Sequence, residues 1–131
     1  MSKKKGTRAE RELLHLFWDN GFAVTRTAGS GSITIPSCDL LAGKNGKTLA
    51  VECKFIKNSI YIKEERINEL REFSEKFGAE PWFGIKVMNK GWFFLPLDKV
   101  EKSKGSNYII SHDIAKRKGV NFDNLILDLE K

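Results

Sequence analysis

The alternation of apolar and polar residues is clearest between residues 38 and 55, where it predicts a β-hairpin. Asn45 and Gly46 suit a two-residue type I′ turn, because both residues accept the positive φ angles that this turn requires. Counting outward from the turn places Asp39 directly opposite Glu52. The other pairs expected from this register are Lys44–Lys47, Ala42–Leu49, Leu40–Val51 and Cys38–Cys53.

The two faces of the predicted hairpin differ in character, because successive side chains alternate between them. One face is apolar and should lie on the core; it carries Cys38, Leu40, Ala42, Leu49, Val51, Cys53 and Phe55. The other face carries Asp39, Glu52 and Lys54 at the end away from the turn. Opposed carboxylates about 5 Å apart repel unless a cation lies between them, and a metal ion would resolve that conflict. The alternative is an ordinary solvated strand face.

Helical periodicity predicts a helix from about Thr7 to Asn20, with an apolar stripe of Leu13, Leu14, Leu16 and Phe17. Glu10 precedes Leu13 and Leu14 by three and four residues, so it continues the stripe toward the core. Alternatively, Thr7 is the N-cap and Glu10 is its partner in a capping box, a local role that Glu10 could not easily combine with the first.

The remaining pattern predicts a mixed sheet flanked by helices, an α/β fold of the α+β type, from the element order αβββαββ. The expected elements are a strand at 22–26, a loop of Gly29–Ser32 running to Pro36, a helix at 63–77 ended by Gly78, strands at 82–87 and 92–97, a strand at 107–111 and a helix at 122–130. The loop could close over a nucleic acid or be a surface insertion. Lys86 lies on the strand face opposite Phe83 and Ile85, where it could contact phosphate or water.

The length of 131 residues fits one domain, with a basic mobile arm at 1–6 and a small C-terminal unit at 105–131. The net charge is +6, from 23 basic and 17 acidic residues, with basic clusters at Lys3–Lys5 and Lys116–Lys118. Such a surplus favours a polyanionic partner such as DNA, although basic domains also use it for solubility.

The same sequence argues against several other classes of protein. No apolar run approaches the length of a membrane span, and Lys3–Lys5 lead into an amphipathic helix instead of a signal-peptide core, so a soluble, intracellular protein is expected. Cys38 and Cys53 lack Cys-x-x-Cys spacing and the histidines lie far apart, which argues against zinc. In a reducing compartment both cysteines should be free thiols.

Glu10, Asp39 and the run Glu52-Cys53-Lys54 resemble the motif of the PD-(D/E)xK nuclease superfamily, with its restriction-endonuclease-like core. More specific likeness surrounds these residues: the segments 6–12, 21–26, the Ser30 loop, 72–78 and the region from Gly105 are similar to the archaeal Holliday junction resolvase family, Hjc. One departure is Cys38, which stands where the superfamily name expects proline; that proline shapes backbone and ligates nothing.

The resemblance implies a homodimer that binds four-way DNA junctions and nicks opposing strands symmetrically, using Mg²⁺ or, as a substitute, Mn²⁺. It implies that Glu10, Asp39 and Glu52 hold the metal, that Lys54 stabilises the transition state and that Ser30 positions phosphate or water. The residues expected to contact DNA are Arg11, Arg26, Ser30, Lys86, Lys3, Lys4 and Lys5. Phe73 and Phe77 are expected in the dimer interface, although burial within one subunit explains the same spacing.

The family resemblance also implies a role in recombination and repair, in the cytoplasm with the nucleoid, and leaves a sliding clamp or branch-migration helicase as further partners. Two other functions stay open at this point. One is a nuclease of the same superfamily that acts on damaged or ordinary duplex DNA. The other is a non-catalytic junction-binding protein, against which the complete set of three carboxylates and one lysine argues.

Overall fold

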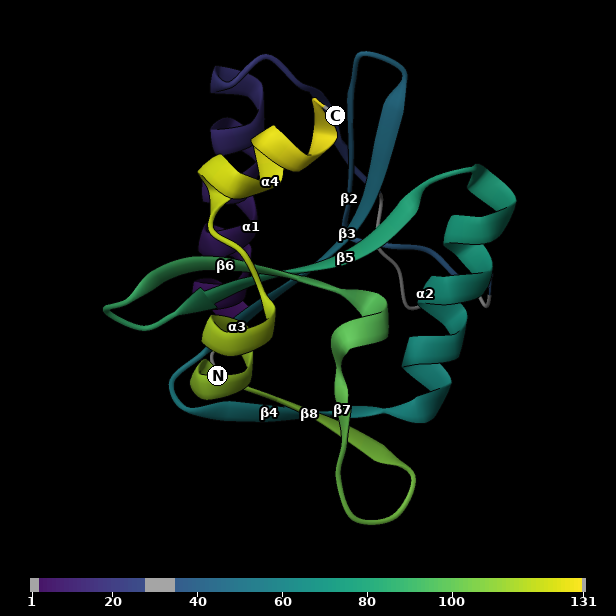
Figure 1. Ribbon diagram of the computed structural model, residues 1–131, viewed down its shortest axis with the longest axis vertical. Coiled ribbons are helices and arrows are strands. Elements are labelled where there is room, and N and C mark those ends of the chain that lie inside the picture. Colours follow the sequence, from purple (N-terminus) through teal and green to yellow (C-terminus); the bar gives the residue numbers. More distant parts are fainter. Residues whose placement is uncertain (1–2, 28–34, 131) are drawn as a thin grey trace.

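A computed structural model describes residues 3–27 and 35–130 of the chain. Its centre is a five-stranded sheet in the order β1-β2-β3-β5-β6 (Figure 1). The strands are β1 (Ala23–Arg26), β2 (Leu40–Lys44), β3 (Lys47–Ile56), β5 (Glu80–Val87) and β6 (Gly91–Pro96). The β3–β5 pair is parallel and the other three pairs are antiparallel, so the sheet is mixed, as predicted.

The predicted hairpin forms with the predicted turn. Asn45 and Gly46 have φ angles of 54° and 80°, and the ladder runs from Leu40–Val51 to Lys44–Lys47 in the expected register. The two pairs expected beyond Leu40, Asp39–Glu52 and Cys38–Cys53, are not part of the ladder, because β2 begins at Leu40.

The apolar face predicted for the hairpin is buried from Leu40 to Val51 and partly buried at Cys53 and Phe55, whereas Cys38 is buried on the other side of the sheet. Leu40, Leu49 and Val51 pack with Leu13 and Phe17 of α1 (Lys3–Asp19). Cys38 instead joins the core on the opposite side of the sheet, because the chain leaves the regular alternation before β2.

The opposite face of the sheet is also buried, which the solvated-face alternative did not allow. Ala50 is fully buried there, in one cluster with Ile67 and Leu70 of α2 (Glu64–Phe77). The two helices therefore cover opposite faces of the sheet, with the strands between them in Figure 1. Of the two carboxylates predicted on this face, Glu52 is buried and Asp39 is partly buried.

A second, three-stranded sheet has the order β4-β8-β7, with strands β4 (Ser59–Lys63), β7 (Glu101–Lys102) and β8 (Asn107–Ser111). A 3₁₀ turn, η1 (Leu97–Lys99), precedes β7. Of these elements only β8 was predicted. Ile62 and Ile110 turn inward from this sheet into the α2 side of the core, which explains why so short a sheet is stable.

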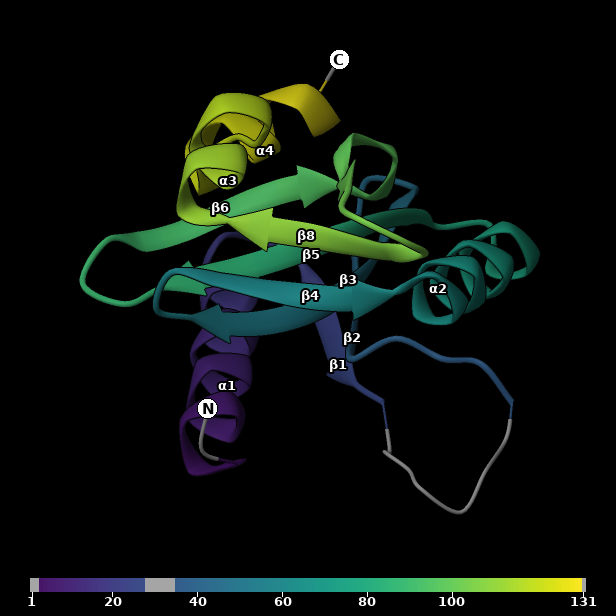
Figure 2. The ribbon, with the colours of Figure 1, turned by 90° about the horizontal axis from the view of Figure 1, so that it is seen from below.

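The C-terminal segment is part of the same packed structure. α3 (His112–Lys118) and α4 (Phe122–Leu129) lie together beside β6, as Figure 2 shows. Phe122 packs edge-on against Phe17 of α1 with ring centroids 5.4 Å apart. The region predicted as a small C-terminal unit therefore supplies one strand to the second sheet and part of the core around α1.

The first helix begins earlier than predicted, at Lys3, so residues 3–6 of the expected arm are helical. Thr7 consequently lies inside α1 and is not its N-cap, so the capping-box alternative for Glu10 is wrong. None of the helices formed by residues 3–27 and 35–130 is both long enough and apolar enough to cross a membrane.

Candidate active site

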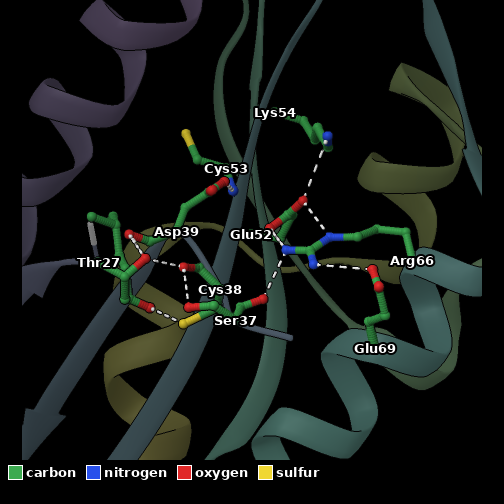
Figure 3. A network of polar contacts seen from close by, with 10 residues as sticks. Thr27, Ser37, Cys38, Asp39, Glu52, Cys53, Lys54, Arg66 and Glu69 are labelled. Carbon is green, nitrogen blue, oxygen red and sulfur yellow. Dashed lines mark hydrogen bonds and ion pairs between the residues drawn. The ribbon is translucent and has the colours of Figure 1, made fainter. Parts of the chain in front are cut away.

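Asp39 lies immediately before β2, where its side chain bridges to the neighbouring strand. Its Oδ2 accepts a hydrogen bond of 2.8 Å from the main-chain amide of Cys53, and its own amide donates to the Val51 carbonyl at 3.0 Å. Thr27 holds the segment from the other side: its amide donates to the Asp39 carbonyl at 3.0 Å and its hydroxyl to the Cys38 carbonyl. Figure 3 shows Asp39 held between these contacts.

Glu52, on β3, is 5% exposed and accepts hydrogen bonds on both carboxylate oxygens. Arg66 of α2 donates from Nη2 to Oε1 at 2.7 Å and from Nε to Oε2 at 3.1 Å, a bidentate ion pair. Lys54, two residues along β3, has its Nζ 3.6 Å from Oε2 (Figure 3). The carboxylate of Glu52 is therefore compensated by two cations.

Arg66 was not among the predicted site residues, although the sequence carried a signal for it. Arg66 precedes Leu70 by four residues and Phe73 by seven, so it continues the apolar stripe of α2 just as Glu10 continues that of α1. Besides Glu52, its guanidinium donates to the Ser37 carbonyl at 2.9 Å and lies 3.5 Å from Glu69. Arg66 thus connects β3, α2 and the segment that leads to Asp39.

Glu10 projects from α1 toward the same end of the sheet and pairs with Arg26 at the end of β1, with Nε 2.7 Å from Oε1. Arg26, predicted to contact DNA, therefore has a site carboxylate as its partner in this structure. Arg11, the next residue on α1, is exposed. Arg26 directly precedes Thr27, whose amide bonds to the Asp39 carbonyl, so Glu10 lies near Asp39, and its charge is one of those that raise the pKa of Asp39.

The charges at this end of the sheet act on one another. Burial, followed by the charges of Glu52 and Glu10, raises the pKa of Asp39 from 3.8 to about 7, although the hydrogen bond from the Cys53 amide and the charge of Lys54 act in the opposite direction. Burial and the Asp39 charge also raise the pKa of the Cys38 thiol to about 12 and that of the Cys53 thiol above its ordinary value. Both thiols are neutral at pH 7, which argues against a cysteine nucleophile.

The three carboxylates supply the hard oxygen donors that Mg²⁺ prefers, and a bound cation would favour the ionised form of Asp39, whose pKa is raised by burial and by the neighbouring carboxylates. As the side chains stand, no group of three or more His, Cys, Asp or Glu residues within 3–27 and 35–130 is arranged to hold a metal ion. The reason is visible in the contacts: Glu52 is turned to Arg66, Glu10 to Arg26, and Asp39 to the Cys53 amide.

The other predicted DNA contacts divide into described and undescribed residues. Lys86 of β5 is not free in solvent: its Nζ lies 2.5 Å from both carboxylate oxygens of Glu12, which also accepts from Trp92 Nε1 at 3.1 Å. Although burial raises the pKa of Glu12, these hydrogen bonds lower it below its ordinary value. Ser30 and the side chains of Lys3, Lys4 and Lys5 lie outside the described part of the chain.

The two aromatic residues predicted for a dimer interface lie together at the C-terminal end of α2. Phe73 and Phe77 stack with ring centroids 5.5 Å apart, and Phe77 is 53% exposed. They line a shallow pocket with Ile35, Pro36, Glu72 and Lys76. Phe73 is half-buried against the core, whereas Phe77 contributes apolar surface to solvent.

Comparison with known proteins gives a consistent result. The whole chain, residues 1–131, matches the family model of the archaeal Holliday junction resolvase, Hjc. The chain belongs to this family. The crossover junction endodeoxyribonuclease Hjc of Archaeoglobus fulgidus is 40% identical to it over 114 residues, which cover 86% of this chain and 82% of that protein. The crossover junction endodeoxyribonuclease Hjc of Methanocaldococcus jannaschii is 40% identical over 112 residues, which cover 85% of this chain and 79% of that protein.

A solved structure of A. fulgidus Hjc, titled as a Holliday junction resolvase from an archaeal hyperthermophile, superimposes with a TM-score of 0.82 and 32% identity, covering 92% of this Hjc-family chain and 94% of that one. The mixed sheet flanked by helices is therefore a nuclease fold of the PD-(D/E)xK type, and both the fold class and the family inferred from sequence are confirmed.

Proposed function

We propose that this Hjc-family protein is a metal-dependent endonuclease that resolves four-way DNA junctions by paired, symmetric nicks during recombination and repair. The observation that carries the proposal is the placement of Asp39 and Glu52 at the same end of neighbouring strands, with Lys54 beside Glu52. The proposal is also supported by the names of the relatives of this chain, which are crossover junction endodeoxyribonucleases.

Asp39 and Glu52, with Glu10 from α1, would hold Mg²⁺, or Mn²⁺ in its place, because carboxylate oxygens are the ligands that these ions prefer. When bound, such an ion polarises the scissile phosphate and lowers the pKa of a coordinated water. The protein's own part is to keep Asp39 in place through the Cys53 amide and to limit the access of bulk water to Glu52.

Lys54 supplies a positive charge where negative charge develops in phosphodiester hydrolysis. Its ammonium lies 3.6 Å from Glu52 and its side chain is 26% exposed, so it can reach a phosphate while remaining beside the carboxylates. A fixed cation at the developing charge stabilises the transition state more than the ground state. Ser30 would position phosphate or water from the loop before Asp39.

The predicted DNA contacts are Arg11, Arg26, Lys86 and Lys3–Lys5, acting on the phosphate backbone and therefore with little sequence preference. Arg26 and Lys86 would exchange Glu10 and Glu12 for phosphates as DNA binds. The net charge of +6 favours this exchange. A DNA-acting enzyme of this kind would work in the cytoplasm, on the nucleoid.

A homodimer would supply two sites related by a two-fold axis, which matches the symmetry of a four-way junction. The surface that we propose for it is the aromatic end of α2, because Phe77 is exposed next to the stacked ring of Phe73. A sliding clamp or a branch-migration helicase would be a further partner of the complete enzyme.

The test is a synthetic four-way junction incubated with magnesium, with the products mapped on all four strands and a linear duplex of equal length as the control. We expect paired nicks at symmetric positions and little cutting of the duplex. Equal cutting of the duplex at moderate salt would favour the alternative of a general duplex nuclease. Tight junction binding without any cleavage would favour a non-catalytic binding protein.

A further inference from the structure

Arg66 occupies the oxygens of Glu52 that the proposed metal would need. The bidentate pair uses both oxygens, at 2.7 and 3.1 Å, and a third bond from Nη2 to the Ser37 carbonyl at 2.9 Å fixes the guanidinium in place. Figure 3 shows the Glu52 carboxylate directed at Arg66 and away from Asp39. A divalent ion at about 2.1 Å from those oxygens would lie against the guanidinium.

Charge leads to the same conclusion as geometry. Three carboxylates at this end of the sheet, Glu10, Asp39 and Glu52, are accompanied by three cations, Arg26, Lys54 and Arg66. A divalent ion added to that balanced set would raise its net charge by two, and the departure of one cation would offset half of that increase. Arg66 is the cation whose departure would free both oxygens of Glu52.

We propose that Arg66 is a resident counter-ion of Glu52 that competes with the divalent metal, so that metal binding requires the guanidinium to leave the carboxylate. The inference rests on the proposed function, because it assumes that Glu52 ligates the metal. Arg66 is a positioning residue in this account: it holds Glu52 in a metal-free arrangement and keeps the buried carboxylate compensated.

A second partner for the displaced guanidinium is already in place. Glu69, one turn further along α2, has its Oε1 3.5 Å from Nη1 of Arg66, and its side chain is 46% exposed. A change of rotamer at Arg66 would exchange the buried partner Glu52 for the accessible partner Glu69. That exchange would leave a cation at the mouth of the site, within reach of a DNA phosphate.

The experiment is a calorimetric titration of the full-length protein with Mn²⁺, without DNA, for wild type, Arg66→Gln and Arg66→Lys. Arg71→Gln is the matched control, because Arg71 lies on the same helix but bonds to Asn68 at its exposed surface. Removing a charge-assisted bidentate competitor should tighten Mn²⁺ binding about tenfold in Arg66→Gln. Arg66→Lys should bind Mn²⁺ with intermediate affinity, and Arg71→Gln should match wild type.

Thermal unfolding separates competition from a purely structural role. In EDTA, Arg66→Gln should unfold at a lower temperature than wild type because the buried Glu52 carboxylate loses its bidentate partner and keeps only Lys54, and Mn²⁺ should remove most of that difference. A structural role alone would lower the unfolding temperature equally with and without Mn²⁺. If Arg66→Gln does not fold under any condition, Arg66→Lys tests the competition instead. The inference then requires that Arg66→Lys bind Mn²⁺ more tightly than wild type.

The outcomes distinguish the inference from the function on which it rests. Mn²⁺ binding by wild type that is lost in Asp39→Asn, together with unchanged or weaker binding by the Arg66 variants, would overturn the role of Arg66 and leave the proposed function standing. Absence of any Asp39-dependent Mn²⁺ binding in wild type would overturn both.

Discussion

The carboxylate of Asp39 takes the place of a main-chain acceptor for the amide of Cys53, at 2.8 Å, where the regular β2–β3 ladder has ended. This one bond fixes the side chain of Asp39 to the strand that carries Glu52 and Lys54. Because the donor is main chain, the position of Asp39 does not depend on a side-chain rotamer of its partner. The end of the hairpin therefore carries an acidic side chain that is bonded to the neighbouring strand, in place of a further strand pair.

Asp39→Asn should abolish junction cleavage while leaving junction binding intact. The asparagine oxygen can still accept from the Cys53 amide, so the fold is kept, but a charged oxygen donor is lost. We expect the cleavage rate in magnesium to fall about 100-fold or more. Single-turnover cleavage and gel-shift assays on the same junction measure the two effects, and undiminished cleavage would remove Asp39 from the chemistry.

The stability of the metal-free protein should decrease as the pH rises toward neutrality. Burial and the Glu52 carboxylate raise the pKa of Asp39 from 3.8 to about 7, so between these values the folded protein holds a proton that the unfolded chain has released. Stability from this group is full below about pH 4 and is lost as the pH rises through about 7.

Asp39→Asn lacks this group and is the matched comparison for that pH dependence. In EDTA, its unfolding free energy relative to wild type should increase by on the order of a few kcal/mol between about pH 4 and pH 7. Urea denaturation at several pH values measures the difference, and saturating magnesium should reduce it at pH 8. A difference in unfolding free energy that does not change with pH would contradict the raised pKa of Asp39 in the folded state.

Lys54→Met should slow cleavage about 100-fold with little change in junction affinity, because the ammonium acts on charge that develops in the transition state. The methionine keeps most of the apolar stem that the half-buried lysine packs into the site. Lys57→Met, on the exposed segment that follows β3, is the control for loss of one positive charge. Equal effects of the two substitutions on cleavage would indicate a general loss of DNA attraction.

Phe77→Glu should weaken self-association without unfolding the subunit, because the ring is 53% exposed in a single chain. The control is Leu127→Glu, which introduces the same charge at a side chain that is 56% exposed on α4. Sedimentation equilibrium should show a concentration-dependent dimer for wild type and Leu127→Glu and a monomer for Phe77→Glu. A dimer that survives in Phe77→Glu would place the interface elsewhere.

Gly84→Ala should destabilise the fold by about 1–3 kcal/mol, since the core has no room for another methyl group. A Cβ at Gly84 would lie 2.8 Å from Cδ2 of Leu13 and 3.2 Å from Cγ1 of Val51, both fully buried. At Gly43 the nearest atom would be 3.6 Å away, so Gly43→Ala should change stability by less than about 0.5 kcal/mol. Equal denaturation midpoints for the two variants would refute this packing argument.

Local sequence alone determined the hairpin turn, its register and the acidic-x-Lys strand, because turn chemistry and side-chain alternation act over a few residues. Asn45 and Gly46 set the turn, and counting from it placed Asp39 beside the strand of Glu52. The stripe on the first helix likewise placed Glu10 near the site. The sequence, through its resemblance to a family, also indicated the fold class that the comparisons confirm.

Tertiary structure decided which charges meet. Because the β2 ladder ends at Leu40, Asp39 bonds to the Cys53 amide and does not pair with Glu52 as predicted. The packing of α2 places Arg66 against Glu52, which is 14 positions away in sequence. Strand β4 was not predicted, because it pairs with β8, which lies far along the chain, and no local pattern indicates that pairing. Such contacts depend on where whole elements pack, and no local period or spacing specifies that position.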